Sequence, residues 1–269
     1  GYDRALALVP AFPQALNNRG NLLLLAGRLP EALASLDRAI EAQPRYAVAL
    51  SNRAAVLRAL GRHADALADC DRALAVNPGF SEAHANRGAA LAELERHEDA
   101  VAACDRALAL VPGLADALLV RGRAQLALQR GADALATFDR LLAARPDLPD
   151  AVVGRGAALH LMRRHDEALA EYDRALALEP RLVAARNGRA SLLRDAQRTA
   201  EALAEWERAL ADEPSVPQVH HNYGTALLES GRVPEALAAF DRAIALKPDY
   251  VQALHNRTAA LSRLLRHEE

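Results

Sequence analysis

The residues best suited to chemistry in this sequence are an acid and an arginine that stand side by side and return at a fixed interval. The pair, as Asp-Arg or Glu-Arg, stands at residues 3–4, 37–38, 71–72, 105–106, 139–140, 173–174, 207–208 and 241–242. Consecutive copies lie 34 residues apart. A carboxylate can act as a general base, but beside a guanidinium it can equally form an ion pair. Because an active site needs one such pair, its recurrence favours a structural role, and we expect no catalytic residue.

Two cysteines and a group of histidines are the other candidates for chemistry. Cys70 and Cys104 each precede an Asp-Arg pair, in a slot that elsewhere holds an apolar residue such as Trp206. This slot predicts two buried free thiols, which favour a reducing compartment and a cytoplasmic protein. His221 and His255 are one repeat apart, a separation of roughly 10 Å between packed helices. Zinc ligands lie at about 2 Å from the metal, so we expect neither a metal nor a cofactor.

The composition excludes several classes of partner. The chain of 269 residues is 51% hydrophobic but only 4% aromatic, which is typical of a helical protein built from alanine and leucine. Its formal net charge of −2 offers no general attraction for nucleic acid or for an anionic membrane surface. The sequence contains no run of 18 apolar residues, so we expect no membrane-spanning segment.

The organisation of the chain follows a period of 34 residues. Its clearest marker is a proline, at residues 10, 44, 78, 112, 146, 180, 214 and 248. Between two prolines the apolar residues fall on one face of each of two helices, for example over 49–60 and 66–74. Glycines at 27, 61 and 231 suit a left-handed turn between the helices, whereas Glu95, Gln129 and Arg163 stand at that place in three other repeats.

Small residues at fixed places complete the pattern. If each proline is position 32 of its repeat, position 8 is glycine or alanine (residues 20, 54, 88, 122, 156, 190 and 224) and position 20 is always alanine (residues 32, 66, 100, 134, 168, 202 and 236). A helix–turn–helix unit of 34 residues with these small residues resembles the tetratricopeptide repeat. The resemblance covers the whole chain. It implies an all-α fold, a right-handed superhelical solenoid of stacked helix–turn–helix repeats.

The repeat pattern also predicts the domain boundaries. We expect seven repeats, at 11–44, 45–78, 79–112, 113–146, 147–180, 181–214 and 215–248. Residues 1–10 then form the second helix of a truncated repeat, and residues 249–269 form the first helix and turn of another. Neither end carries the polar capping helix that a solenoid needs for solubility, so we expect the chain to be a piece of a longer protein.

A second set of arginines offers partners for the repeated acids, which stand at position 25. Position 7 holds Arg19, Arg53, Arg87, Arg121, Arg155, Arg189 and Arg257, with Tyr223 as the exception. When antiparallel helices stack, position 7 lies level with the position-25 acids of its own and of the preceding repeat. We therefore expect a ladder of ion pairs, with Arg121 between Asp105 and Asp139 as an example.

The face of the first helices formed by positions 2, 5, 6, 9, 12 and 13, here called the groove face, is the expected binding surface. In the resembling family this face lines a concave groove that holds an extended peptide. Position 6 provides a row of asparagines that can grip a peptide backbone, at Asn18, Asn52, Asn86, Asn222 and Asn256. Val120, Gly154 and Gly188 interrupt the row. The other expected groove residues are Asn17, Asn21, Arg58, Arg123, Asn187, Arg194, His221 and His255. The alternative is that asparagine is simply a common variant at this position of the first helix.

The sequence thus predicts a non-catalytic interaction scaffold that binds an extended peptide or protein segment. One alternative is the substrate-recognition arm of a larger enzyme, since a row of asparagines resembles the groove of the glycosyltransferases that attach N-acetylglucosamine to proteins. A second alternative is self-association through the uncapped ends. We expect a protein or peptide partner, and neither nucleic acid nor membrane.

Overall fold

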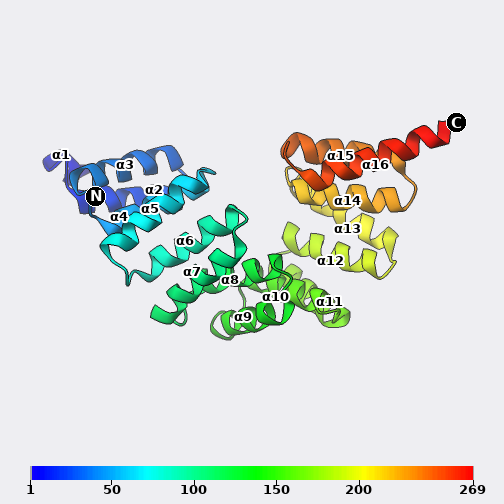
Figure 1. Cartoon of the computed structure of the whole chain (residues 1–269), viewed down its shortest axis with the longest axis horizontal. Helices are drawn as coiled ribbons and strands as arrows, with labels where there is room; N and C mark the ends of the chain where they lie inside the picture. The colour runs from blue at the N-terminus through cyan, green and yellow to red at the C-terminus, as the bar shows by residue number, and fades with distance from the viewer. Residues whose placement is uncertain (1, 269) are drawn as a thin grey trace. The chain divides into compact units, whose positions relative to one another are not determined.

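The computed structural model describes the backbone of residues 2–268 and the side chains of Tyr2 and of residues 6–264. This part of the chain forms helices and turns without a strand, as expected for the all-α fold class (Figure 1). The helices are α1 (Tyr2–Leu8), α2 (Pro13–Leu25), α3 (Leu29–Ala42), α4 (Ala47–Ala59), α5 (His63–Val76), α6 (Ser81–Glu93), α7 (His97–Leu110), α8 (Ala115–Ala127), α9 (Gly131–Ala144), α10 (Pro149–Leu161), α11 (His165–Leu178), α12 (Val183–Asp195), α13 (Thr199–Asp212), α14 (Pro217–Glu229), α15 (Val233–Leu246) and α16 (Val251–Glu268). None of these helices combines the length and the apolar character that crossing a lipid bilayer requires.

The chain divides into two compact units, residues 1–144 and residues 145–269. In the first unit α2 pairs with α3, α4 with α5, α6 with α7 and α8 with α9; in the second, α10 pairs with α11, α12 with α13 and α14 with α15. Within each unit a helix touches only the next one or two helices along the chain. Both units are therefore stacks of helical hairpins held by local contacts, and stability is expected to be a sum over neighbours. Gly1 and Glu269, the outer ends of the two expected half-repeats, lie outside the described residues.

The turn between the two helices of each hairpin has the left-handed residue that the glycines predict. Gly27, Gly61 and Gly231 have φ values of 72°, 74° and 77°. The non-glycine residues at the same place adopt this conformation too, with φ between 59° and 61° at Glu95, Gln129, Arg163 and Gln197. At Gly61 the N–H of the following Arg62 donates to the carbonyl of Leu57 at 2.8 Å, which closes the helix end.

The core of each hairpin is built by an apolar residue at position 24 that packs onto the small residue at position 8. A Cβ added to Gly122 would lie 2.6 Å from the ring of Phe138, and one added to Gly88 would lie 2.6 Å from Sγ of Cys104. At these two positions a side chain would therefore collide with its partner. The slot before the Asp-Arg pair is a packing slot, as predicted, and Cys70 and Cys104 are buried free thiols.

The last expected segment differs from its prediction. A turn was expected near residue 265, but α16 continues as one helix from Val251 to Glu268. Leu265 stands at the position of the turn residue. Leucine is a strong helix former and has no tendency to adopt the left-handed conformation, so the helix continues through it.

Candidate functional site

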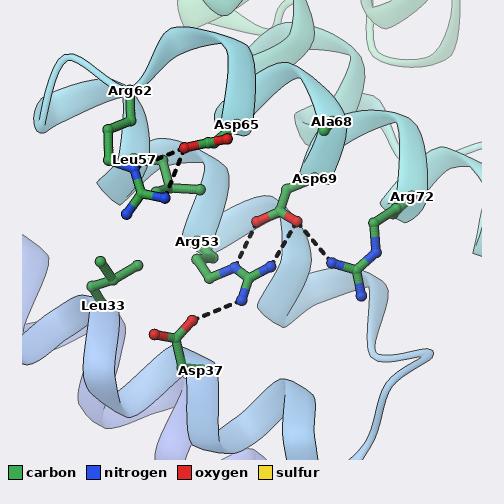
Figure 2. Close-up of a pocket in the computed structure, with 9 residues that line it drawn as sticks. All are labelled: Leu33, Asp37, Arg53, Leu57, Arg62, Asp65, Ala68, Asp69 and Arg72. Carbon is green, nitrogen blue, oxygen red and sulfur yellow. Dashed lines mark hydrogen bonds and ion pairs between the residues drawn. The ribbon is translucent and has the colours of Figure 1, made fainter.

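The predicted ladder of ion pairs joins each hairpin to the preceding one. Nη1 of Arg53 lies 2.7 Å from Oδ1 of Asp37, across the boundary between α4 and α3 (Figure 2). The same pair recurs along both units, as Arg87–Asp71 at 2.7 Å, Arg121–Asp105 at 2.7 Å, Arg189–Asp173 at 2.9 Å and Arg257–Asp241 at 2.5 Å. Tyr223, the exception at position 7, donates its hydroxyl to Glu207 at 3.0 Å. The inter-hairpin half of the prediction is confirmed.

The other end of the ladder was predicted wrongly. Within its own hairpin the arginine contacts position 23, not position 25: Arg53 donates two hydrogen bonds to Asp69, at 2.6 and 2.8 Å. Arg121, expected between Asp105 and Asp139, donates to Thr137 at 2.8 Å. Residues two apart on a helix lie about 200° apart around its axis. Position 25 therefore faces the next hairpin, and position 23 faces the first helix of its own.

Asp69 is the most heavily engaged acid of the first unit. Its side chain is 4% exposed and also accepts a hydrogen bond from Arg72 at 3.0 Å. The hydrogen bonds to Asp69 raise the pKa of the Arg53 guanidinium above its usual value, against the opposing effect of partial burial. A cavity of about 220 Å³ opens beside this group, with Arg62 and Asp65 at its rim (Figure 2). Its three arginines and three aspartates balance, so this cavity favours neither an anion nor a cation.

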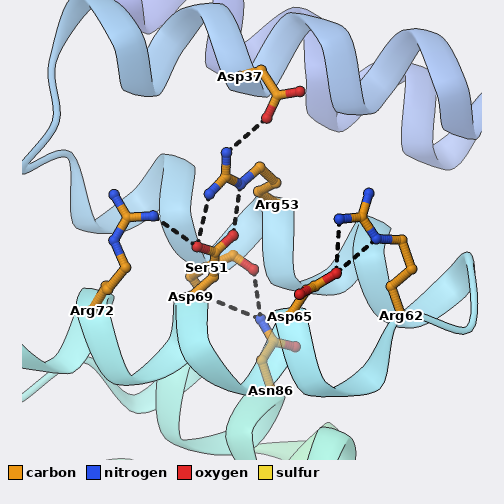
Figure 3. Close-up of polar contacts among 8 residues, drawn as sticks. All are labelled: Asp37, Ser51, Arg53, Arg62, Asp65, Asp69, Arg72 and Asn86. Carbon is orange, nitrogen blue, oxygen red and sulfur yellow. Dashed lines mark hydrogen bonds and ion pairs between the residues drawn. The ribbon is translucent and has the colours of Figure 1, made fainter.

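The asparagine row also joins hairpins. The amide nitrogen of Asn52 donates to Oδ1 of Asn17 at 2.9 Å. Figure 3 shows the next bond of the row, in which the amide nitrogen of Asn86 donates to Oγ of Ser51 at 3.0 Å. Each bond runs from position 6 of one repeat to position 5 of the preceding repeat. In the second unit Asn222 makes the equivalent bond to Asn187 at 3.0 Å and Asn256 to His221 at 3.1 Å.

These hydrogen bonds determine which side-chain atoms of the asparagine row remain available to a ligand. No described residue donates a hydrogen bond to Oδ1 of Asn52 or of Asn86, and both residues are half-buried. At Asn52 and Asn86 the row therefore offers acceptors. Asn17, an expected contact residue, is only 4% exposed and serves the hairpin boundary instead. Asn187 is likewise engaged in hydrogen bonds within the fold, because its Oδ1 accepts from Asn222 and also from Nε1 of Trp206 at 2.9 Å.

The interruption of the row at Gly188 has a packing cause. A Cβ added to Gly188 would lie 2.5 Å from Cε1 of Tyr172, whose side chain is buried. The tyrosine ring at position 24 thus occupies the space in which an asparagine side chain would start. An asparagine at this position is incompatible with the tyrosine.

The remaining expected groove residues lie at or near the surface. Oδ1 of Asn18 accepts from Asn17 at 3.3 Å, and Arg194 contacts Asp195 at 3.2 Å. Nε of the half-buried Arg58 has no hydrogen-bond partner among the described residues. Asn21, Arg123 and His255 are exposed.

His221 is held in one tautomer by its neighbours. Its Nε2 accepts from Asn256, so its proton sits on Nδ1, which lies 3.3 Å from Oδ1 of Asn222. The ring also packs at 5.1 Å from that of Tyr250. Burial lowers the pKa of His221 and outweighs the opposing hydrogen bond with Asn222. His221 is therefore a neutral structural residue on this face.

A pocket in the second unit includes groups that the sequence did not single out. Nε2 of His160 on α10 lies 3.0 Å from Oδ2 of Asp195 on α12, beside a cavity of about 390 Å³. Partial burial alone would raise the pKa of Asp195, but the hydrogen bonds from His160 and Arg194 hold it below its usual value. The two residues are 35 positions apart, the same interval as Asn52 and Asn17. That interval is the signal by which sequence analysis could have found them.

A comparison with models of protein families identifies the family of the chain. The model described as tetratricopeptide repeat matches residues 2–47, 51–115, 119–186 and 187–251, well over half of the sequence. The chain belongs to the tetratricopeptide repeat family. Members of this family are in general protein-interaction scaffolds. No curated protein sequence matches the chain.

Solved structures resemble the chain in fold. A tetratricopeptide repeat protein from Parabacteroides merdae ATCC 43184 matches with a TM-score of 0.77 and 21% identity over 93% of this chain and 98% of that one. The Cut9–Hcn1 hetero-tetramer of the APC/C matches with a TM-score of 0.76 and 16% identity over 97% of this chain and 51% of that one. Yeast Tom70 matches with a TM-score of 0.61 and 20% identity over 98% and 58%. At these identities the likeness concerns the fold alone.

Proposed function

We propose that the groove face of this tetratricopeptide repeat protein binds an extended segment of a partner protein. The observation that carries the proposal is the pair of amide oxygens on Asn52 and Asn86, which accept no hydrogen bond from the described residues. Each is held in place because its amide nitrogen is tied to the preceding hairpin. A fixed acceptor with no internal partner suits a ligand that brings donors, such as a peptide backbone.

The spacing of the two oxygens suits an extended chain. Neighbouring first helices lie roughly 10 Å apart, and an extended peptide advances about 3.3 Å per residue. One asparagine per hairpin therefore meets about every third residue of the segment. Beside the asparagines the face carries small residues, Ala55 and Ala89, each one turn further along the same helix. Their small side chains leave room for a backbone to approach.

The test compares two variants that disturb the same hydrogen bond from opposite sides. A peptide selected from a random library for binding to the whole chain is the probe, and its Kd is measured by isothermal titration calorimetry. Asn86→Ala removes both the hairpin bond and the groove oxygen, whereas Ser51→Ala removes only the hydroxyl that accepts from Asn86. We expect Asn86→Ala to weaken binding by about 5- to 30-fold, the effect of one or two lost hydrogen bonds.

Ser51→Ala should leave the Kd within about two-fold of the parent value, because the Asn86 oxygen remains and the Ser51 carbonyl still accepts the amide. Circular dichroism of both variants provides the check on folding. Equal Kd values for the parent chain and Asn86→Ala would reject the groove face as the binding surface.

A further inference from the structure

The pocket between α10 and α12 is a distinct feature of the groove face in the second unit. Ala157, His160, Leu161, Arg163 and Asp195 line its volume of about 390 Å³. Ala157 and Leu161 give it an apolar wall, and the other three residues give it a charged one. Positions 9, 12 and 13, which supply most of these residues, belong to the face on which we place the partner segment.

The charged groups of the pocket are not equally available. Both oxygens of Asp195 are engaged, Oδ2 with His160 at 3.0 Å and Oδ1 with Arg194 at 3.2 Å. Arg163 is exposed, and no hydrogen bond or ion pair joins its guanidinium to a described residue. The free charge of the pocket is therefore the guanidinium of Arg163. Arg163 and Arg194 together outnumber the single carboxylate.

The backbone of Arg163 adds a second observation. Its φ is 61°, the left-handed conformation that this turn also has at Glu95, Gln129 and Gln197 and at three glycines. The turn thus holds a long cation at the edge of the pocket.

We propose that this pocket holds an acidic side chain, aspartate or glutamate, of the segment bound along the groove face, an inference that rests on the proposed function. The aliphatic stem of the guest packs on Ala157 and Leu161, and its carboxylate pairs with the guanidinium of Arg163. A lysine or arginine guest fits less well. It would meet the unpaired Arg163 and would have to displace His160 or Arg194 from Asp195.

The test uses three fluorescein-labelled nonapeptides of alternating alanine and one polar residue, which is glutamate, glutamine or lysine. Binding to the whole chain is measured by fluorescence anisotropy up to about 1 mM chain at physiological salt, where long-range attraction is screened within about 8 Å. We expect the glutamate peptide to bind at least five-fold more tightly than the glutamine peptide, and the lysine peptide to bind most weakly.

Two variants, each of which removes one positive charge, test whether the preference for glutamate arises at the pocket. Arg163→Gln should abolish the preference for glutamate, and its backbone is tolerated because Gln129 and Gln197 adopt the same conformation at the equivalent turns. Arg242→Gln removes an exposed cation from α15, away from the pocket, and should leave the preference within two-fold.

Three outcomes overturn the inference: a glutamate preference that survives Arg163→Gln, a lysine peptide that binds most tightly, or no binding of any of the three peptides. The proposed function is judged separately by the effect of Asn86→Ala on the library-selected peptide. The failure of one proposal is therefore distinguishable from the failure of the other.

Discussion

Asn52 donates its side-chain amide to Oδ1 of Asn17 at 2.9 Å, so two residues 35 positions apart hold neighbouring first helices together. Since Asn17 is only 4% exposed, this bond is sheltered from water. The same asparagine turns its oxygen away from the bond, with no acceptor role inside the described chain. One residue thus fixes the register of two hairpins and presents an acceptor at a defined height on the groove face.

The arginine ladder predicts unequal costs for removing two equivalent arginines. Arg53 pairs with Asp37 and with the buried Asp69, whereas Arg87 pairs at 2.7 Å with Asp71, whose side chain is 55% exposed. Arg53→Met leaves a buried carboxylate short of its main partner and should cost about 2–4 kcal/mol of unfolding free energy. Arg87→Met should cost less than about 1 kcal/mol. Urea denaturation followed by circular dichroism measures both.

Asp69→Ala in the Arg53→Met background is the matched control. It removes the stranded carboxylate and should recover part of the lost stability, because the coupling between neighbouring groups is not additive. Equal losses for Arg53→Met and Arg87→Met would contradict the importance of the position-23 acid.

The tautomer of His221 predicts a pH dependence in the second unit. The pKa of His221 is lowered by folding from its ordinary value of 6.5, so the unfolded chain binds the extra proton first. The free energy of unfolding contributed by this residue is fully present above pH 6.5 and falls as the pH drops through the lowered pKa. Protonation of Nε2 would also place an N–H against the amide of Asn256.

This dependence is measured as the difference in unfolding free energy between pH 7.5 and pH 5.5. His221→Gln should reduce that difference, because glutamine can accept from Asn256 without titrating. His255→Gln, at the same position of the next repeat but exposed, is the control and should leave the difference unchanged. The account is wrong on this point if the two variants behave alike.

The contact between Gly188 and Tyr172 predicts that the asparagine row cannot be extended. Although alanine is favoured over glycine in a helix by about 1 kcal/mol, Gly188→Ala should destabilise the second unit by about 1–3 kcal/mol through overpacking. A Cβ there would sit 2.5 Å from the ring. In a Tyr172→Leu background the same substitution should cost less, and a double-mutant cycle from urea denaturation gives the coupling. A stabilising Gly188→Ala would show that the ring moves aside freely.

The two thiols should be unreactive in the folded chain. Burial raises the pKa of Cys70 and of Cys104 to about 12, and little reactive thiolate exists at neutral pH. Maleimide labelling at pH 7.5, followed by mass spectrometry, should be slow in buffer and complete in urea. Ala68→Cys adds an exposed thiol on α5 and should be labelled at once. Fast labelling of all three thiols would mean that the hairpins open readily.

The repeat architecture could be predicted almost completely from the sequence, because helical hairpins are local structures. The prolines and glycines mark the helix ends, and the small residue at position 8 predicts where Phe138 or Cys104 must pack. The pair of Arg53 with Asp37 follows from the antiparallel geometry as well. Such features recur in most repeats and can be read from a single chain.

Features that differ between repeats were not predictable in this way. Position 23 is acidic in Asp69 but threonine in Thr137, so the second partner of the arginine has no constant signal. The bond between His160 and Asp195 depends on two variable positions in successive repeats. The use of the Asn52 amide for the hairpin boundary requires knowledge of where the preceding side chain lies.

The most direct test of the groove account follows the side-chain amide signals of Asn52 and Asn86 by 1H–15N nuclear magnetic resonance during a titration with the library-selected peptide. Asn77 is the internal reference, since it is exposed in a loop and its Oδ1 accepts from Gly79 at 3.2 Å. The account predicts saturable shifts of Asn52 and Asn86, with Asn77 unmoved. A peptide that saturates the chain while the signals of Asn52 and Asn86 stay in place would contradict it.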